Sequence, residues 1–150
     1  GAELTLSSDH HLTLLVKDET GWGSLCHLIS LAQHNAAKGE AALPPEQLAD
    51  HTAGLIVLSG CKRGAIATHL LRKEPEAALA AAHRYRELFG SDNFWIELQH
   101  HLLPEDEPLV AELVALAQHL GLGYVVTNNV HYARRADRRL RRAASPSRGS

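Results

Sequence analysis

The sequence predicts an α/β fold, because short apolar segments of strand length alternate with longer amphipathic segments of helix length. The expected strands are residues 1–6, 12–16, 54–59, 93–98 and 124–127. The expected helices start at Thr20, after Pro44, and at residues 65, 75 and 105. This alternation is typical of βα units around a parallel sheet, open or closed into a barrel. The active and binding sites of such sheets lie at the carboxyl ends of the strands.

Each element has its own signal, in chain order. The first helix has apolar residues at helical spacing on one face, namely Trp22, Leu25, Leu28, Ile29 and Ala32. Pro45 suits the first turn of the short helix that follows. Residues 54–59 form an apolar run of buried-strand length, and a helix is expected over residues 65–72. The helices 75–89 and 105–120 are amphipathic and end at Gly90 and Gly121.

Length and composition indicate one domain with a sizeable core in 150 residues. There is no apolar run long enough for a membrane span and no signal-peptide pattern. The first residue is Gly and the chain has no Met, so we expect a fragment of a longer protein. Cys26 and Cys61 are too far apart for a CxxC motif, which favours a reducing cytoplasm over a disulfide scaffold.

The formal charge of -2 is unevenly distributed. Residues 134–150 hold seven of the 15 Lys and Arg residues and only one acid, Asp137. Residues 1–133 are therefore strongly acidic. The electrostatic field of these residues would repel nucleic acid, which argues against nucleic-acid binding through it. The basic tail, 134–150, can touch phosphate, but its composition favours an irregular terminus or the start of the next segment.

Polar residues gather at the expected strand ends. Most of the 11 histidines lie on or beside helices and are expected to be structural or solvated. The strand ends carry Glu3, His10, His11, Cys61, Glu97, His100, His101, Asn129 and His131. Carboxylate, imidazole and thiolate are the ligands of zinc and related ions, so this set predicts a metal site. The plainer alternative is a small buried cysteine and solvated polar side chains.

Nucleophilic catalysis is the weaker alternative. The segment Ser59-Gly60-Cys61 is no G-x-S-x-G elbow, so a Ser/His/Asp hydrolase is not expected. A Cys/His pair built on Cys61 stays open as a minor alternative.

Four segments resemble one family in order and register. They are residues 11–22 (HLTLLVKDETGW), 55–61 (LIVLSGC), 95–101 (WIELQHH) and 126–132 (VTNNVHY). They resemble the PHP (polymerase and histidinol phosphatase) domain at the amino end of bacterial DnaE-type polymerases, the alpha subunits of DNA polymerase III. The opening GAELTL, the DETGW run and the TNNVHY ending are most similar to the error-prone DnaE paralogue of damage-induced mutagenesis. The resemblance covers residues 1 to about 140.

The resemblance implies a (β/α)7 TIM-like PHP barrel, of which this chain is a part lacking the first strands. Residues 1–133 would be the C-terminal part of the PHP domain. The family site is a metal cluster of Zn, Mn or Mg, which some bacterial members use to remove mispaired 3′ nucleotides. By position, its ligands here are Glu3, His11, Cys61, Asn129 and His131, with His10 a substitute for His11 and His101 a weak candidate.

Two departures from the family pattern affect the metal site. The H-x-H pair of the family's first strands is missing, so we expect an incomplete cluster. Asn129 stands where the family has Asp, and an amide oxygen is a weaker, uncharged ligand. We therefore expect a degenerate hydrolase site whose role is mainly structural.

The parent protein is expected to be a cytoplasmic DNA-directed DNA polymerase of replication and repair. Its other domains are the expected partners, DNA is bound through them, and no membrane is involved. None of this chain's residues can be assigned to nucleotide addition. The alternatives are an active metal-dependent 3′–5′ exonuclease or phosphoesterase, and a free-standing PHP phosphatase.

Overall fold

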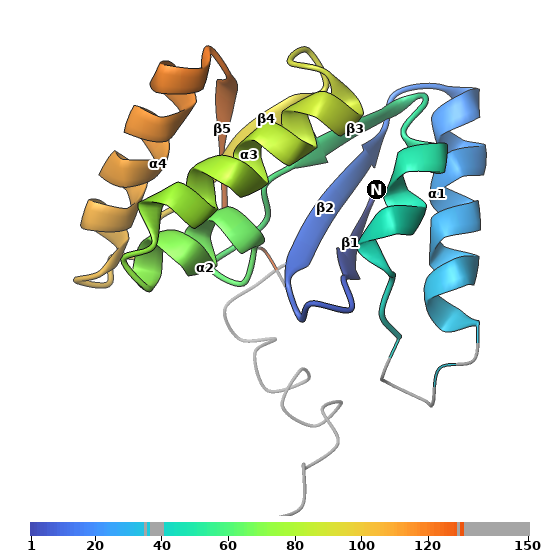
Figure 1. The fold of residues 1–150 in the computed structure, drawn as a ribbon, viewed down its shortest axis with the longest axis horizontal. Helices are drawn as coiled ribbons and strands as arrows, with labels where there is room; N and C mark the ends of the chain where they lie inside the picture. The colour runs from blue at the N-terminus through green and yellow to red at the C-terminus, as the bar shows by residue number, and fades with distance from the viewer. Residues whose placement is uncertain (35, 37–40, 129, 131–150) are drawn as a thin grey trace, which may run out of the picture.

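The computed structural model describes residues 1–34, 36, 41–128 and 130, and it contains one sheet with its helices (Figure 1). In chain order the elements are β1 (Ala2–Thr5), β2 (His11–Val16), α1 (Glu19–Gln33), the 3-10 helix η1 (Pro45–His51), β3 (Leu55–Leu58), α2 (Ala65–Leu71), α3 (Pro75–Phe89), β4 (Phe94–Gln99), α4 (Asp106–Leu120) and β5 (Gly123–Thr127). Within these residues, every helix is too short or too polar to cross a membrane.

The five strands form one mixed sheet in the order β1-β2-β3-β4-β5. Strands β3, β4 and β5 are parallel, as expected for βα units. The expectation of a parallel sheet is wrong for the first half, because β1, β2 and β3 pair antiparallel. For β1 and β2 the reason is the short connection between them, since Thr5 at the end of β1 pairs with His11 at the start of β2. So short a connection makes a hairpin, whereas a parallel crossover needs a dozen or more residues.

The two faces of the sheet differ in chemistry. One face is apolar and packs against α1, α3 and α4 through Leu4, Leu12, Leu14, Val57, Phe94 and Ile96, all buried. The strand registers place a second set of side chains on the opposite face, because side chains alternate along a strand. We call this the polar face; its polar residues are Glu3, Thr5, His11, Thr13, Glu97, Gln99 and Thr127.

Helix α1 places one glycine, and not Trp22, against the sheet. Asp18 caps the helix by accepting a hydrogen bond from the Gly21 amide at 2.9 Å. A Cβ atom on Gly21 would lie 1.8 Å from the Gly54 carbonyl oxygen, so only glycine allows this approach. The buried stripe therefore runs through Gly21, Leu25, Leu28 and Ala32. The expectation that Trp22 lies on the buried face is wrong, since its side chain is 61% exposed.

The remaining helices begin and end close to the expected residues. Pro75 opens α3, and Gly90 follows its last residue. Gly121 ends α4 in the left-handed conformation, with a φ of 64°. The segment after Pro44 is a 3-10 helix with Leu48 buried. These elements fix the strand ends on which the candidate site lies.

Candidate metal site

Glu3 and His11 meet across the hairpin of β1 and β2. Thr5 pairs with His11 and Glu3 pairs with Thr13, so Glu3 and His11 are diagonal neighbours on the polar face. The His11 Nδ1 atom lies 2.9 Å from Glu3 Oε1. The His11 side chain is 13% exposed and that of Glu3 is 44% exposed, so the pair lies at the rim of the sheet.

Cys61 reaches the same place from the loop after β3. The amide of His11 donates to the Arg63 carbonyl at 2.9 Å, which ties this loop to the start of β2. Gly60 has a φ of 87°, and a Cβ atom there would lie 2.5 Å from the His11 carbonyl oxygen. Glycine therefore allows the loop to pass close to β2. The Cys61 Sγ atom lies 3.9 Å from His11 Nδ1.

Glu3, His11 and Cys61 form the donor triad. Their ligand atoms all lie within 4.8 Å of one another. Burial raises the pKa of the Cys61 thiol, and the negative charges of Glu3 and Glu97 raise it further, against a lowering backbone hydrogen bond from Arg63. A carboxylate, an imidazole and a thiol at this spacing fit a zinc-type divalent cation, which binds such donors in their deprotonated forms.

Among the described residues, the other histidines that the sequence placed at strand ends do not join the triad. His10 has its Nδ1 atom 3.2 Å from Ser8 Oγ and its ring 5.8 Å from that of His69. Its pKa is lowered by burial and by the nearby His69 and Arg72. His100 accepts a hydrogen bond from the Leu102 amide in a local turn. His10 therefore does not take the place of His11.

The exposed His101 also lies apart from the triad, and its amide donates to Asp106 at 2.6 Å. The two remaining predicted ligands, Asn129 and His131, lie outside the described residues. Their part in the site stays a prediction from the sequence.

A buried carboxylate lies further along the polar face. Glu97 is 6% exposed. Its Oε1 atom accepts hydrogen bonds from Gln99 Nε2 at 3.0 Å and from the Thr127 hydroxyl. Its amide donates to Ser59 Oγ at 2.9 Å. The strand-end position of Glu97 was visible in the sequence, but its burial and its three partners depend on the register of β3, β4 and β5.

An ion pair holds the loop after Cys61 to α4. Lys62 contacts the Asp106 carboxylate, whose side chain is fully buried. The Lys62 ammonium, together with amides of Leu103 and His101, holds the pKa of Asp106 far below its usual range despite burial. The ion pair thus anchors the loop next to Cys61, one member of the triad.

We expect Asp106→Asn to lower the stability of the chain at neutral pH. The folded-state pKa of Asp106 lies below the value of about 4 for an unfolded Asp, so its stabilising effect is present above pH 4. That effect is lost as the pH falls toward the folded-state pKa. The difference in melting temperature from the wild type should therefore be largest near pH 7 and shrink below about pH 4. Glu107→Gln, at an exposed neighbour, is the control. A difference that does not change with pH would contradict the assignment.

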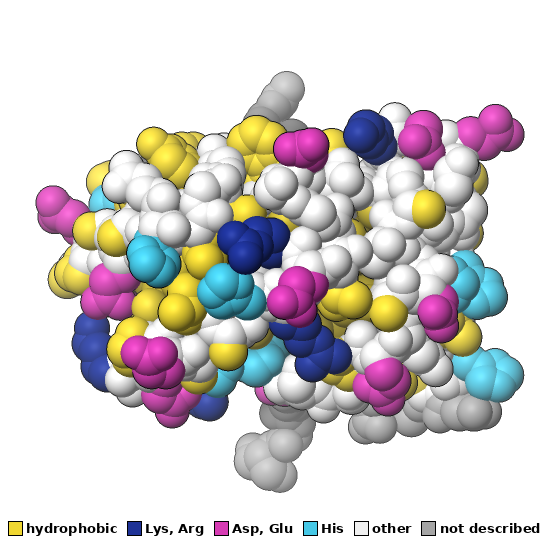
Figure 2. Space-filling model, turned by 45° about the horizontal axis from the view of Figure 1, so that its top comes forward, with side chains coloured by type: hydrophobic (Ala, Val, Ile, Leu, Met, Phe, Trp, Pro, Cys, Tyr) yellow, Lys and Arg dark blue, Asp and Glu magenta, His cyan; other side chains and the backbone are white. Residues whose placement is uncertain are grey.

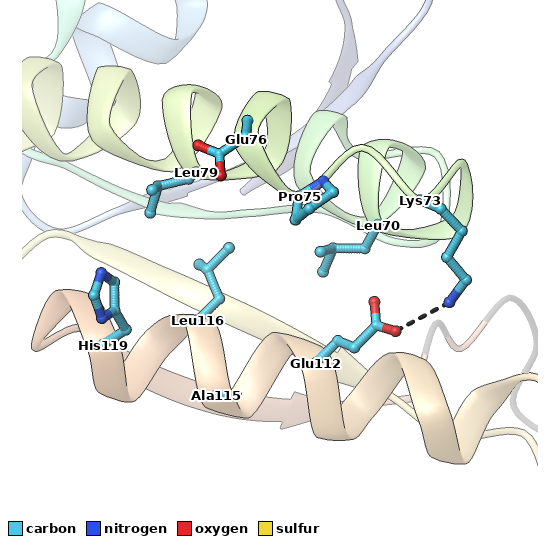
Figure 3. A pocket seen from close by; sticks show the side chains of 9 residues that line it. All are labelled: Leu70, Lys73, Pro75, Glu76, Leu79, Glu112, Ala115, Leu116 and His119. Carbon is cyan, nitrogen blue, oxygen red and sulfur yellow. Dashed lines mark hydrogen bonds and ion pairs between the residues drawn. The ribbon is translucent and has the colours of Figure 1, made fainter.

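The groove between α2, α3 and α4 is separate from this site (Figure 3). It has a volume of about 550 Å³ and is lined largely by apolar side chains such as Leu70, Leu79 and Leu116. Lys73 and Glu112 form an ion pair of 3.1 Å at one end of it. None of the triad residues lines this groove, so the two places share no side chain.

Charges of both signs are mixed on the face that Figure 2 presents. Acidic, basic and histidine side chains alternate there among hydrophobic ones, without a large patch of one sign. This face therefore lacks the extended basic surface by which proteins attract a phosphate backbone.

Comparison with known proteins gives one family and two kinds of relative. The family model "PHP domain" matches residues 1–101. The DNA polymerase III subunit alpha of Treponema pallidum (strain Nichols) is 41% identical over 128 residues, which are 85% of this chain and 11% of that protein. The error-prone DNA polymerase of Symbiobacterium thermophilum is 39% identical over 153 residues, covering 91% of this chain and 14% of that protein. The one from Pseudomonas savastanoi pv. phaseolicola is 33% identical, with 93% of this chain and 13% of that protein covered. The chain thus spans only a small part of the relatives it matches.

Proposed function

This chain belongs to the PHP domain family, and we propose that it is part of the PHP domain of an error-prone bacterial DNA polymerase. Residues 1–133 would form the C-terminal part of that domain, and 134–150 would lead into the next segment. The similarity to polymerases of both names over 85% and 91% of the chain supports this proposal. DNA synthesis, DNA binding and the contacts with other domains would then belong to the whole polymerase.

We propose that the sheet is a segment of a (β/α)7 barrel whose interior is lined by the polar face. Two observations support this. The helices α1, α3 and α4 pack on the opposite face, as the outer helices of such a barrel do. Apolar side chains of Leu15 and Trp95 are 38% and 36% exposed on the same side as the triad, where further strands of a closed barrel would cover them.

The donor triad carries the proposal for the site. Glu3, His11 and Cys61 would hold one divalent cation of the Zn, Mn or Mg group, and the thiol favours Zn over Mg. A bound cation of this kind supplies Lewis-acid chemistry for phosphodiester hydrolysis. The residues of this chain would hold the cation at the strand ends and tie β1, β2 and the loop after β3 together.

We propose that hydrolysis by this site is weak and that its role is mainly structural. Asn129 carries no charge at the position where the family has an acid, so one anionic ligand is lost. The competing function is an active metal-dependent 3′–5′ exonuclease, which the close packing of the donor triad favours.

The full-length protein should show little metal-dependent removal of a mispaired 3′ nucleotide. The measurement uses a primer with a mispaired 3′ end, added Mn²⁺ or Zn²⁺, and no deoxynucleotides, so that cleavage is separated from synthesis. Asn129→Asp restores the anionic ligand and should raise the cleavage rate by about tenfold or more.

His131→Ala is the matched control for that assay. It should leave the low wild-type rate unchanged and abolish the gain in the Asn129→Asp protein. Fast wild-type cleavage that His131→Ala removes would establish the exonuclease instead.

A further inference from the structure

Glu97 has a buried carboxylate oxygen that the proposed site has not used. Its Oε1 atom accepts two hydrogen bonds, from Gln99 and Thr127. Its Oε2 atom is buried and has no hydrogen-bond partner among the described residues. No Lys, Arg or His in the described part of the chain forms an ion pair with Glu97. A buried anion in this state is unfavourable unless a cation or a donor meets the free oxygen.

The strand registers place Glu97 on the same face as the donor triad. Glu3 pairs with Thr13, Thr13 with Leu58, and Leu58 with Trp95. Since side chains two residues apart share a face, Glu97 lies on the face of Trp95, and therefore of Glu3. Four neighbouring strands or strand ends thus present Glu3, His11, Cys61 and Glu97 toward one side.

A hydrogen bond also ties Glu97 to the loop that carries Cys61. The Glu97 amide donates to the hydroxyl of Ser59, which is buried and lies two residues before Cys61. The negative charge of Glu97 raises the pKa of the Cys61 thiol, as the charge of Glu3 does. Glu97 is not among the groups whose ligand atoms lie within 4.8 Å of one another, so it lies outside the inner set of donors.

We infer that Glu97 is an outer-sphere ligand of the divalent cation that Glu3, His11 and Cys61 hold. The inference rests on the proposed metal site. The hydrogen-bonded Oε1 atom of Glu97 fixes the orientation of the carboxylate. Its Oε2 atom would supply negative charge and a hydrogen-bond acceptor beside the cation. Outer-sphere partners of this kind orient and charge-balance metal sites without direct coordination. Glu97 would thereby add a negative charge beside the donor triad.

The test is a Co²⁺ titration of the full-length protein against a chelating indicator, followed by absorption spectroscopy. Glu97→Gln keeps the size of the side chain and an oxygen that accepts from Gln99 and Thr127, but it removes the charge. The dissociation constant for Co²⁺ should rise about 10- to 100-fold. The sulfur-to-cobalt charge-transfer absorption of the saturated protein should persist, because Cys61 still binds. Glu87→Gln, at an exposed glutamate of α3, is the matched control and should bind like the wild type.

Glu97→Asp separates the effect of charge from that of packing, since it keeps the carboxylate on a shorter side chain. It should retain more affinity than Glu97→Gln. Unchanged Co²⁺ affinity in Glu97→Gln, or an equal loss in both variants, would overturn the outer-sphere role while leaving the site itself intact. Absence of the charge-transfer absorption in the Co²⁺-treated wild type would overturn the proposed site, and the role of Glu97 with it.

Discussion

Replacing His11 by alanine is expected to weaken binding of Zn²⁺ or Co²⁺ to the full-length protein by roughly two orders of magnitude, or about 2.7 kcal/mol. His11 is the central member of the donor triad, because its Nδ1 atom lies 2.9 Å from Glu3 and 3.9 Å from Cys61. The variant loses one ligand of the donor triad and its contacts with the other two members. Competition with a chelating indicator measures the change.

The control for this variant is His119→Ala. His119 is an exposed histidine near the end of α4, and it lines the apolar groove instead of the polar face. Its removal should leave the affinity unchanged. Equal affinities for the wild type and the His11→Ala protein, with the fold retained in circular dichroism, would rule out a metal site at the triad.

Phe94→Ala should lower the free energy of unfolding by roughly 3–5 kcal/mol. Phe94 begins β4, is fully buried, and packs its ring 5.7 Å from that of Tyr85 on α3. Alanine would leave a cavity at the junction of the sheet and α3. Because whole domains are stable by only about 5–15 kcal/mol, this loss would remove a large share of the stability and move the urea midpoint to a much lower concentration. Urea unfolding of the purified 150-residue chain, followed by tryptophan fluorescence, measures the loss.

Trp22→Ala provides the contrasting case. The Trp22 side chain is 61% exposed, so its removal should change the stability by less than about 1 kcal/mol. A loss as large as that of Phe94→Ala would mean that α1 is rotated relative to the described packing.

The sequence was a good guide to elements whose signal is local. Helices α3 and α4 begin and end within a residue of the expected bounds, because Pro75, Gly90 and Gly121 mark their ends. The face of α1 was predicted less well. Periodicity assigned Trp22 to the core, whereas the close approach of the Gly21 and Gly54 backbones sets the rotation of that helix. Such an approach depends on two segments distant in sequence, so local periodicity cannot reveal it.

The βα pattern of the sequence did not predict that the first three strands pair antiparallel. A helix lies between β2 and β3, yet these strands pair antiparallel, with Val16 opposite Leu55. Residues Glu3, His11 and Cys61 of the predicted set come together all the same, because the hairpin and the loop after β3 bring their strand ends to one rim. The burial of Glu97 could not be foreseen, since Ser59, Gln99 and Thr127 meet it only through the pairing of three strands.

The identity of the metal ligands can be measured most directly by cobalt absorption spectroscopy. The full-length wild-type protein, loaded with Co²⁺, should show a sulfur-to-cobalt charge-transfer band from Cys61. The band should be absent in Cys61→Ser and unchanged in Cys26→Ser, whose side chain is exposed on α1. A Co²⁺-loaded wild type without this band, or a band that Cys61→Ser retains, would contradict a metal site built from Glu3, His11 and Cys61.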